Sequence, residues 1–169
     1  MLSTQNLLLI ITATATALMA GLFFAYSCSV IPGLARLSDK EYLSAMQSIN
    51  RAIQNPIFFT VFFGTLLLLT FSAYLHYGQP LPARFLLLSG ATFIYICGVS
   101  GVTIFGNVPL NEMLNNFNIQ AASQEAIHAQ RIAFEGRWNN LNMIRTIASL
   151  VTIILVVISC TSFSKTEIN

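Results

Sequence analysis

Four long runs of uncharged residues constrain this chain more than any other feature. They cover Leu7–Ile31, Ile57–Leu75, Phe85–Phe105 and Ile147–Phe163. A helix of about 17–25 apolar residues crosses the hydrocarbon layer of a bilayer, and all four runs have that length. Charged residues make up 8% of the sequence, against about 25% in soluble domains. The sequence therefore predicts an integral membrane protein whose main solvent is lipid.

These runs predict an all-α, integral membrane four-helix bundle. We expect a single domain over residues 1–169 with spans at about 7–31, 57–75, 85–105 and 143–163. The first run is too long for the hydrophobic region of a signal peptide and has no Lys or Arg before it, so we expect it to be retained. Small residues recur at every fourth position of this span (Ala13, Ala17, Gly21, Ala25 and Ser29), which favours close approach of another helix.

The distribution of basic residues predicts the orientation of this multi-pass protein. Four spans place residues 32–56 and 107–146 on one side, and the N-terminus, the 76–84 turn and the C-terminal tail on the other. The first side has Arg36, Lys40, Arg51, Arg131, Arg137 and Arg145, and the second has Arg84 and Lys165. Cytoplasmic loops carry the excess of Lys and Arg, so the first side is expected in the cytoplasm. If the protein is bacterial, the expected membrane is the plasma or inner membrane. No basic patch with interleaved aromatic residues indicates nucleic-acid binding.

A polar segment between the first two spans predicts an additional interfacial helix. Ser38-Asp-Lys-Glu41 has the capping-box pattern, and the helix is expected to end near Gln54, before Asn55-Pro56. One face is apolar, and its neighbour carries the amides Gln47, Asn50 and Gln54. The helix either lies on the membrane surface or directs Gln47 and Asn50 into a polar pocket.

The segment NVPLNEML, residues 107–114, directly follows the third uncharged run. Asn is a favoured N-cap and Pro is tolerated in the first helical turn. The pattern thus predicts that one helix ends here and another begins, with Asn107 as its cap and a helical segment between spans three and four. Capping does not explain Asn111, one turn further along.

A second polar segment, EGRWNNLNMIRT, covers residues 135–146. Its residues Glu135, Trp138, Asn142 and Arg145 have the spacing of one helical face. An arginine about one turn into a membrane helix is costly unless it snorkels to the headgroups or is paired. Snorkelling alone would not require a carboxylate, an indole and an amide on the same face. A polar site, which Asn111 would join, is therefore the second interpretation.

Several motifs resemble those of one membrane protein family. SVIPGL (29–34), AMQSIN (45–50), NPIFF (55–59), NVPLN (107–111) and RWNNLNMIRT (137–146) resemble, in order and over nearly the whole chain, the DUF1772 family of anthrone oxygenase-like proteins. The resemblance implies a four-helix membrane bundle. It also implies oxidation of a flat aromatic molecule, without a known cofactor, as described for fungal members. The polar positions of the family correspond to Gln47, Asn50, Asn107, Asn111, Trp138, Asn142 and Arg145.

The candidate residues suggest how such a reaction would proceed. Arg145, Asn142 and Asn111 can donate hydrogen bonds to an oxyanion in a low-dielectric site. Trp138 can stack on the rings of a substrate. Asn107, Asn50 and Gln47 are the other candidate substrate-binding residues. Glu135 or Glu112 can act as the base. The alternative is a non-enzymatic protein that binds a small molecule, aids permeation or serves as a structural subunit, in which the amides only hold helices together.

The sequence predicts no metal or cofactor site. The two histidines, His76 and His128, fall on opposite sides of the predicted membrane. Glu125-x-x-His128 has a spacing found in di-iron bundles, but those sites need two such motifs and further glutamates. Cys28, Cys97 and Cys160 lie in apolar runs without a CxxC pair, which is typical of buried, inert thiols.

Overall fold

The computed structural model describes residues 3–161, which form helices joined by short turns, with no β-strand in that range. Four helical segments are long and apolar enough to cross a membrane. The first comprises α1 (Thr4–Ala25), the π-helix η1 (Tyr26–Val30) and α2 (Ile31–Leu34), and the second is α4 (Pro56–Leu75). The predicted membrane bundle is confirmed.

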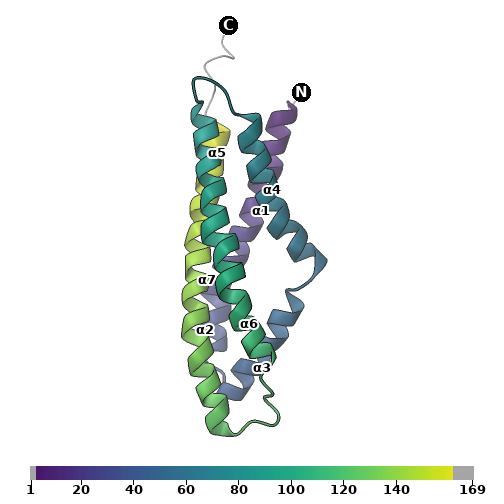
Figure 1. The fold of residues 1–169 in the computed structure, drawn as a ribbon, viewed down its shortest axis with the longest axis vertical. Coiled ribbons are helices and arrows are strands. Elements are labelled where there is room, and N and C mark those ends of the chain that lie inside the picture. Colours follow the sequence, from purple (N-terminus) through teal and green to yellow (C-terminus); the bar gives the residue numbers. More distant parts are fainter. Residues whose placement is uncertain (1–2, 162–169) are drawn as a thin grey trace.

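The third and fourth spans are longer than the sequence runs that predicted them. The third comprises α5 (Ala83–Ile94), the π-helices η2 (Tyr95–Gly101) and η3 (Thr103–Asn107), and α6 (Val108–Asn115); the fourth is α7 (Gln124–Thr161). The predicted helical segment between them is thus divided between α6 and the first turns of α7. Residue 163, the predicted end of the fourth span, and Lys165 lie outside the described residues. The start of α1 and the 76–82 turn lie at one end of the bundle, and α3 (Asp39–Ala52) at the other (Figure 1).

The prediction that Asn107 caps a new helix is wrong. Its backbone is helical, with φ −71° and ψ −38°, and its side chain makes no capping hydrogen bond. Pro109 lacks an N–H and would crowd the carbonyl four residues earlier in an α-helix. The Val108 N–H instead bonds to the Thr103 carbonyl, five residues back, and this wider π turn lets the helix continue. Because the backbone needs no cap, the amide of Asn107 is left for another use.

The helix predicted from the capping box is confirmed as α3. The Glu41 carboxylate accepts hydrogen bonds from the Ser38 N–H at 3.1 Å and from its hydroxyl at 2.6 Å. Tyr42, Leu43 and Met46 are fully or almost fully buried in a cluster with α6 and α7. The apolar face of α3 therefore packs against protein and closes one end of the bundle.

The third and fourth spans pack closely where the third span carries glycine. A Cβ built on Gly98 would lie 2.6 Å from Cβ of Ala148, and one on Gly106 would lie 3.0 Å from Cδ1 of Leu141. In the first span, by contrast, Gly21 of the small-residue ridge does not lie at a close contact with another helix. A Cβ on Gly21 would have no atom within 4 Å, and the buried face of α1 is formed by Leu9, Thr12, Thr16, Met19 and Phe23.

Large apolar side chains cover the outside of the spans. Leu67, Phe93 and Ile154 are 70%, 67% and 55% exposed, a pattern that suits contact with lipid. Cys28, Cys97 and Cys160 are also exposed. The prediction of buried thiols is therefore wrong. The outer face of a membrane helix contacts lipid, so an apolar run can place its cysteines outside as well as inside the bundle.

Candidate functional site

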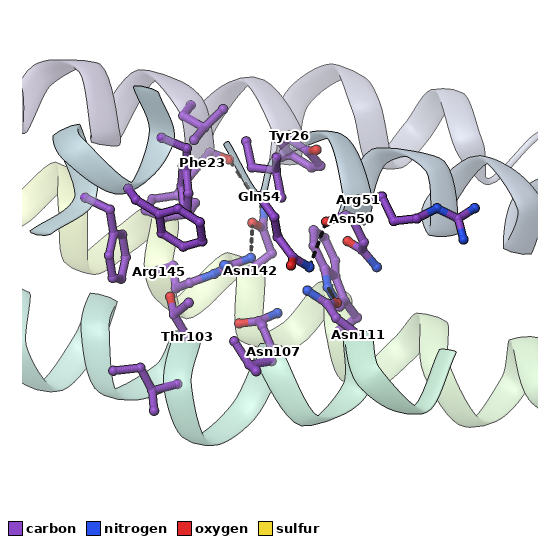
Figure 2. A pocket seen from close by; sticks show the side chains of 18 of the residues that line it. Phe23, Tyr26, Asn50, Arg51, Gln54, Thr103, Asn107, Asn111, Asn142 and Arg145 are labelled. Carbon is purple, nitrogen blue, oxygen red and sulfur yellow. Dashed lines mark hydrogen bonds between the residues drawn. The ribbon is translucent and has the colours of Figure 1, made fainter. Parts of the chain in front are cut away.

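A cavity of about 410 Å³ lies where α1, α3, α4, the third span and α7 converge. One part of its wall is aromatic, formed by Phe23, Tyr26, Phe58, Phe59, Phe62 and Phe63. Polar side chains form other parts of the wall, namely Asn50, Thr103, Asn107, Asn111, Asn142 and Arg145. Of these, Thr103, Asn107 and Asn111 lie across the cavity from Phe23 and Tyr26 (Figure 2). The size is within the range of about 300–1,000 Å³ that is usual for small-molecule sites, and a mainly apolar wall with a few polar groups is also typical.

Arg145 is the only cationic side chain that is buried among the described residues, with 7% exposure. The Cζ atom of its guanidinium lies 4.6 Å from the ring centroid of Phe23 and 5.3 Å from that of Trp138. Nη2 donates a 2.9 Å hydrogen bond to Oδ1 of Asn142. No carboxylate within residues 3–161 forms an ion pair with it. Two rings and one amide therefore hold a positive charge at the cavity without neutralising it.

Asn142 connects Arg145 to the first span. Its Nδ2 donates to Oγ of Ser27 at 2.9 Å, and the Ser27 hydroxyl also shares a 2.8 Å bond with that of Thr146. Since Asn142 accepts from the guanidinium with one end and donates to Ser27 with the other, its amide orientation is determined by both neighbours. This chain of bonds links Arg145 to η1 of the first span.

Asn111 is held by the same face of α7. Its Oδ1 accepts a 2.8 Å hydrogen bond from the indole N–H of Trp138. The Trp138 ring also contacts Tyr26, with 5.8 Å between ring centroids, and stacks on Phe134 at 6.3 Å. The indole therefore stands between the aromatic part of the cavity and the amides of the third span.

Several buried polar atoms at the cavity have no hydrogen-bond partner in the protein. They are Nδ2 and Oδ1 of Asn107, Nδ2 of Asn50 and Nε of Arg145. Asn107 is 1% exposed and Asn50 is 5% exposed, and both line the cavity. Buried polar groups in native proteins are almost always hydrogen-bonded. These donors and the acceptor are thus free to bond to a molecule in the cavity.

Comparison with known families gives one match. Residues 58–155, more than half of the chain, match the family described as anthrone oxygenase. The chain belongs to the anthrone oxygenase family. Comparisons with curated proteins and with solved structures give no match. The segment that matches the anthrone oxygenase family supplies Asn107, Trp138 and Arg145 to the cavity, whereas Phe23 and Asn50 precede it.

Two of the predicted site residues lie elsewhere in this anthrone oxygenase-family fold. Glu135 does not line the cavity; its Oε2 accepts a 2.7 Å bond from Nε of Arg131. Arg131 also bonds to Asp39 at 2.9 Å, so Glu135 belongs to a charged cluster between α3 and α7. Gln47 donates to the carbonyls of Leu114 and Phe117 at 2.8 and 2.9 Å and ties α3 to the end of α6. The other six, Asn50, Asn107, Asn111, Trp138, Asn142 and Arg145, line the cavity.

Sequence reasoning missed the aromatic wall. Phe58 and Phe62 of α4 stack with 5.4 Å between centroids, and Phe59 and Phe63 stack at 6.2 Å. Their spacing of four residues was a visible signal, because residues i and i+4 adjoin on a helix. Ser27, the partner of Asn142, had no such signal, since its role depends on how α1 packs against α7.

Neither histidine lines the cavity. Nδ1 of His128 pairs with Oδ2 of Asp39 at 2.7 Å, and Nδ1 of His76 lies 2.8 Å from the Ser72 carbonyl near the end of α4. Within residues 3–161, no three side chains of His, Cys, Asp or Glu form a cluster with the arrangement of a metal site. Glu112 is the one carboxylate on the cavity wall in this part of the chain.

Proposed function

We propose that this protein binds a flat, mostly apolar molecule with a carbonyl group in the cavity and oxidises it with dioxygen. The observation that carries this proposal is the set of unpaired polar atoms on Asn107, Asn50 and Arg145 in a cavity that is also lined by six Phe and Tyr side chains. Rings would lie against the phenylalanines, and the carbonyl oxygen would accept bonds from the polar wall. Membership of the anthrone oxygenase family supports this class of substrate.

Arg145 is the residue proposed to stabilise the negative charge that develops on the carbonyl oxygen. Its guanidinium forms no ion pair with a carboxylate within residues 3–161, and its Nε has no hydrogen-bond partner in this part of the chain. A fixed donor in a low-dielectric site stabilises an oxyanion more strongly than water does, because it needs no reorganisation. Asn107, with both amide atoms free, is proposed to orient the substrate. Asn142 is proposed to position Arg145.

The proposed reaction balances with dioxygen as the only oxidant. A ring CH₂ group conjugated with a carbonyl loses one proton and leaves a delocalised anion. This anion adds dioxygen to form a peroxide anion, which takes the proton back and becomes a hydroperoxide. The hydroperoxide then loses water and leaves a second ring carbonyl. The CH₂ carbon gives up four electrons; one oxygen atom stays in the product and the other leaves as water. Glu112, the carboxylate on the cavity wall, is the proposed proton acceptor.

A non-enzymatic role is the second candidate. The closed bonds between Asn111 and Trp138 and between Asn142 and Ser27 favour it, because such buried networks rigidify a bundle without any chemistry. Under this reading the cavity binds a molecule without changing it, or the amides only join the spans.

Anthrone is the probe that separates these candidates. Trp138 is the single tryptophan of the chain, so its fluorescence reports occupancy directly. We expect anthrone to change this fluorescence and to be converted to anthraquinone above the protein-free rate, with one dioxygen consumed per product. Binding without consumption of dioxygen would support the non-enzymatic role. The absence of both binding and conversion would overturn the proposed function.

Two arginines of α7 provide the matched test of mechanism. Arg145→Gln is expected to lower turnover by roughly 10²–10³-fold, as removal of an oxyanion donor does. Arg137→Gln changes an exposed arginine outside this cavity and is expected to keep the wild-type rate. Equal turnover in wild type and Arg145→Gln would remove Arg145 from the mechanism.

The end of the bundle that carries α3 is proposed to face the cytoplasm. Arg145 is buried in the cavity and Arg131 is ion-paired, but Arg36, Lys40, Arg51 and Arg137 still outnumber Arg84 of the described residues at the other end. In a cysteine-free background, Ser48→Cys should react with a membrane-impermeant maleimide only in inside-out vesicles. Reaction in right-side-out vesicles alone would reverse the orientation.

A further inference from the structure

The cavity is bounded on one side by side chains that are also exposed on the outside of the bundle. Phe59 and Phe63 of α4 line the cavity and are 43% and 48% exposed. Across from them, Ile104 of η3 and Val108 of α6 line it and are 45% and 39% exposed. All four residues belong to membrane-spanning helices. The rim of this opening, formed by Phe59, Phe63, Ile104 and Val108, is thus entirely apolar.

The course of α4 explains why this side is open. The main packing of α4 is against α1 and α5, and its Pro56 end leans away from α6 in Figure 1. The helix begins here because Asn55 caps it, with Oδ1 accepting a 3.0 Å bond from the Phe58 N–H, and because Pro56 is suited to the first turn. With α3 packed against α6 and α7, the short connection at residues 53–55 carries the chain outward. Although Phe62 of α4 accepts a hydrogen bond from Tyr95 of η2, α4 does not pack closely against η3 or α6.

We propose that the ligand enters the cavity laterally from the hydrocarbon layer of the bilayer, through an opening between α4 and the third span that this rim surrounds. This inference rests on the proposed function only in that a ligand occupies the cavity. The ligand class follows from the two ends of the path: a membrane-dissolved ring compound enters through an apolar rim, and its polar edge ends at Asn107 and Arg145.

Polarity along the cavity supports entry from lipid rather than from water. The exposed polar side chains Arg51, Glu112 and Asn115 line another part of the wall, and Arg51 donates a 3.3 Å bond to Oδ1 of Asn115. An apolar ligand coming from water would have to pass these hydrated groups. A ligand already dissolved in the membrane meets only the apolar rim and replaces one apolar environment by another, which costs little desolvation free energy.

Lipids with brominated acyl chains test the opening without any substrate. Trp138 lines the cavity and is 4% exposed, so brominated chains quench its fluorescence efficiently only if they reach the cavity. We expect strong quenching of wild type in nanodiscs of brominated phosphatidylcholine, and weaker quenching by aqueous iodide. Quenching by iodide but not by brominated lipid would mean that the cavity opens to water and would overturn the proposal.

Filling the rim tests its use as an entrance. In the double variant Ile104→Phe, Val108→Phe we expect at least twofold less lipid quenching and at least tenfold slower binding of anthrone preloaded into vesicles. The control Ile154→Phe adds the same ring on α7 at a residue that is 55% exposed and does not line the cavity. It should behave as wild type.

The two proposals fail in different ways. If wild type neither binds nor oxidises anthrone, the proposed function fails, while lipid quenching of Trp138 still tests the opening. If anthrone is oxidised but the filled rim changes neither quenching nor the binding rate, lateral entry is overturned and the function stands. If the double variant does not fold, the contrast between brominated lipid and iodide on wild type decides the question.

Discussion

The indole N–H of Trp138 donates a 2.8 Å hydrogen bond to Oδ1 of Asn111, across 27 residues of sequence. This bond joins the fourth span to the third at the wall of the cavity. It also gives Asn111, which no capping role explains, a partner within the protein. Asn111 and Asn107 lie one helical turn apart, yet Asn107 keeps both amide atoms unpaired. The two asparagines are therefore expected to respond in opposite ways to mutation.

Replacing Asn111 by alanine is expected to destabilise the protein. The buried indole N–H would lose its acceptor, which costs about 1–3 kcal/mol in free energy of unfolding. Thermal unfolding in detergent should show a lower midpoint, and the emission of Trp138 should shift. The control Asn116→Ala changes an exposed asparagine at the end of α6 and should leave both unchanged. An unaltered midpoint in Asn111→Ala would mean that the bond contributes no net stability.

Replacing Asn107 by leucine is expected to stabilise the ligand-free protein by about 1–3 kcal/mol. Leucine has a similar volume, and it removes two buried polar atoms without partners, whose desolvation is uncompensated. The same variant should weaken binding of anthrone at least tenfold, measured by Trp138 fluorescence. A loss of stability together with unchanged binding would contradict the ligand-binding role of Asn107.

Adding one methyl group at Gly98 is expected to force α5–η2 and α7 apart. The new Cβ of Gly98→Ala would lie 2.6 Å from Cβ of Ala148, and overpacking of this kind costs about 1–3 kcal/mol. Gly64→Ala is the matched control, because a Cβ there would meet no atom within 4 Å. Thermal unfolding of both variants in the same detergent gives the comparison. Equal midpoints would show that the two spans separate at no cost.

Acidification is expected to weaken the contact between α3 and α7. The hydrogen bond from His128, and after it the one from Arg131, hold the pKa of Asp39 below its usual value of 3.8. Since the folded-state pKa is the lower one, this stabilisation is present above pH ~4 and is lost as the pH falls through the folded-state pKa. Asp39→Asn should lower the unfolding midpoint at pH 7 and flatten its decline below pH 4.

The matched control for this acid-sensitive contact is Glu112→Gln, whose carboxylate forms no ion pair within the described residues. It should show the full acid-induced decline of wild type. An identical pH profile for Asp39→Asn and wild type would exclude Asp39 as the source of the effect.

Elements that depend on local patterns could be predicted from the sequence. The four spans follow from uncharged runs, and α3 follows from the Ser38–Glu41 capping box. The shared face of Trp138, Asn142 and Arg145 follows from helical spacing, and all three line the cavity. Glu135 has the same spacing but lies one turn nearer the start of α7, where Arg131 pairs with it. Spacing determines the face of a helix, but the neighbours determine what each side chain meets.

Asn107 shows where local reasoning fails. Asn before Val-Pro matches a helix start, yet two π-helices let the third span continue through it. Tertiary packing overrides the local preference here, because α7 and α3 already enclose this part of the helix. The continuation turns a predicted cap into a buried amide with no partner in the protein.

The sequence by itself determined that this chain spans a membrane with four helices, because the length and apolarity of each run suffice for that conclusion. It also determined which polar residues share helical faces. Only the tertiary structure decided that Asn107 and Arg145 line a common cavity, that Glu135 does not, and that exposed apolar residues of α4 and the third span border that cavity. These features depend on contacts between residues far apart in sequence, whose geometry is determined by the packing of whole helices.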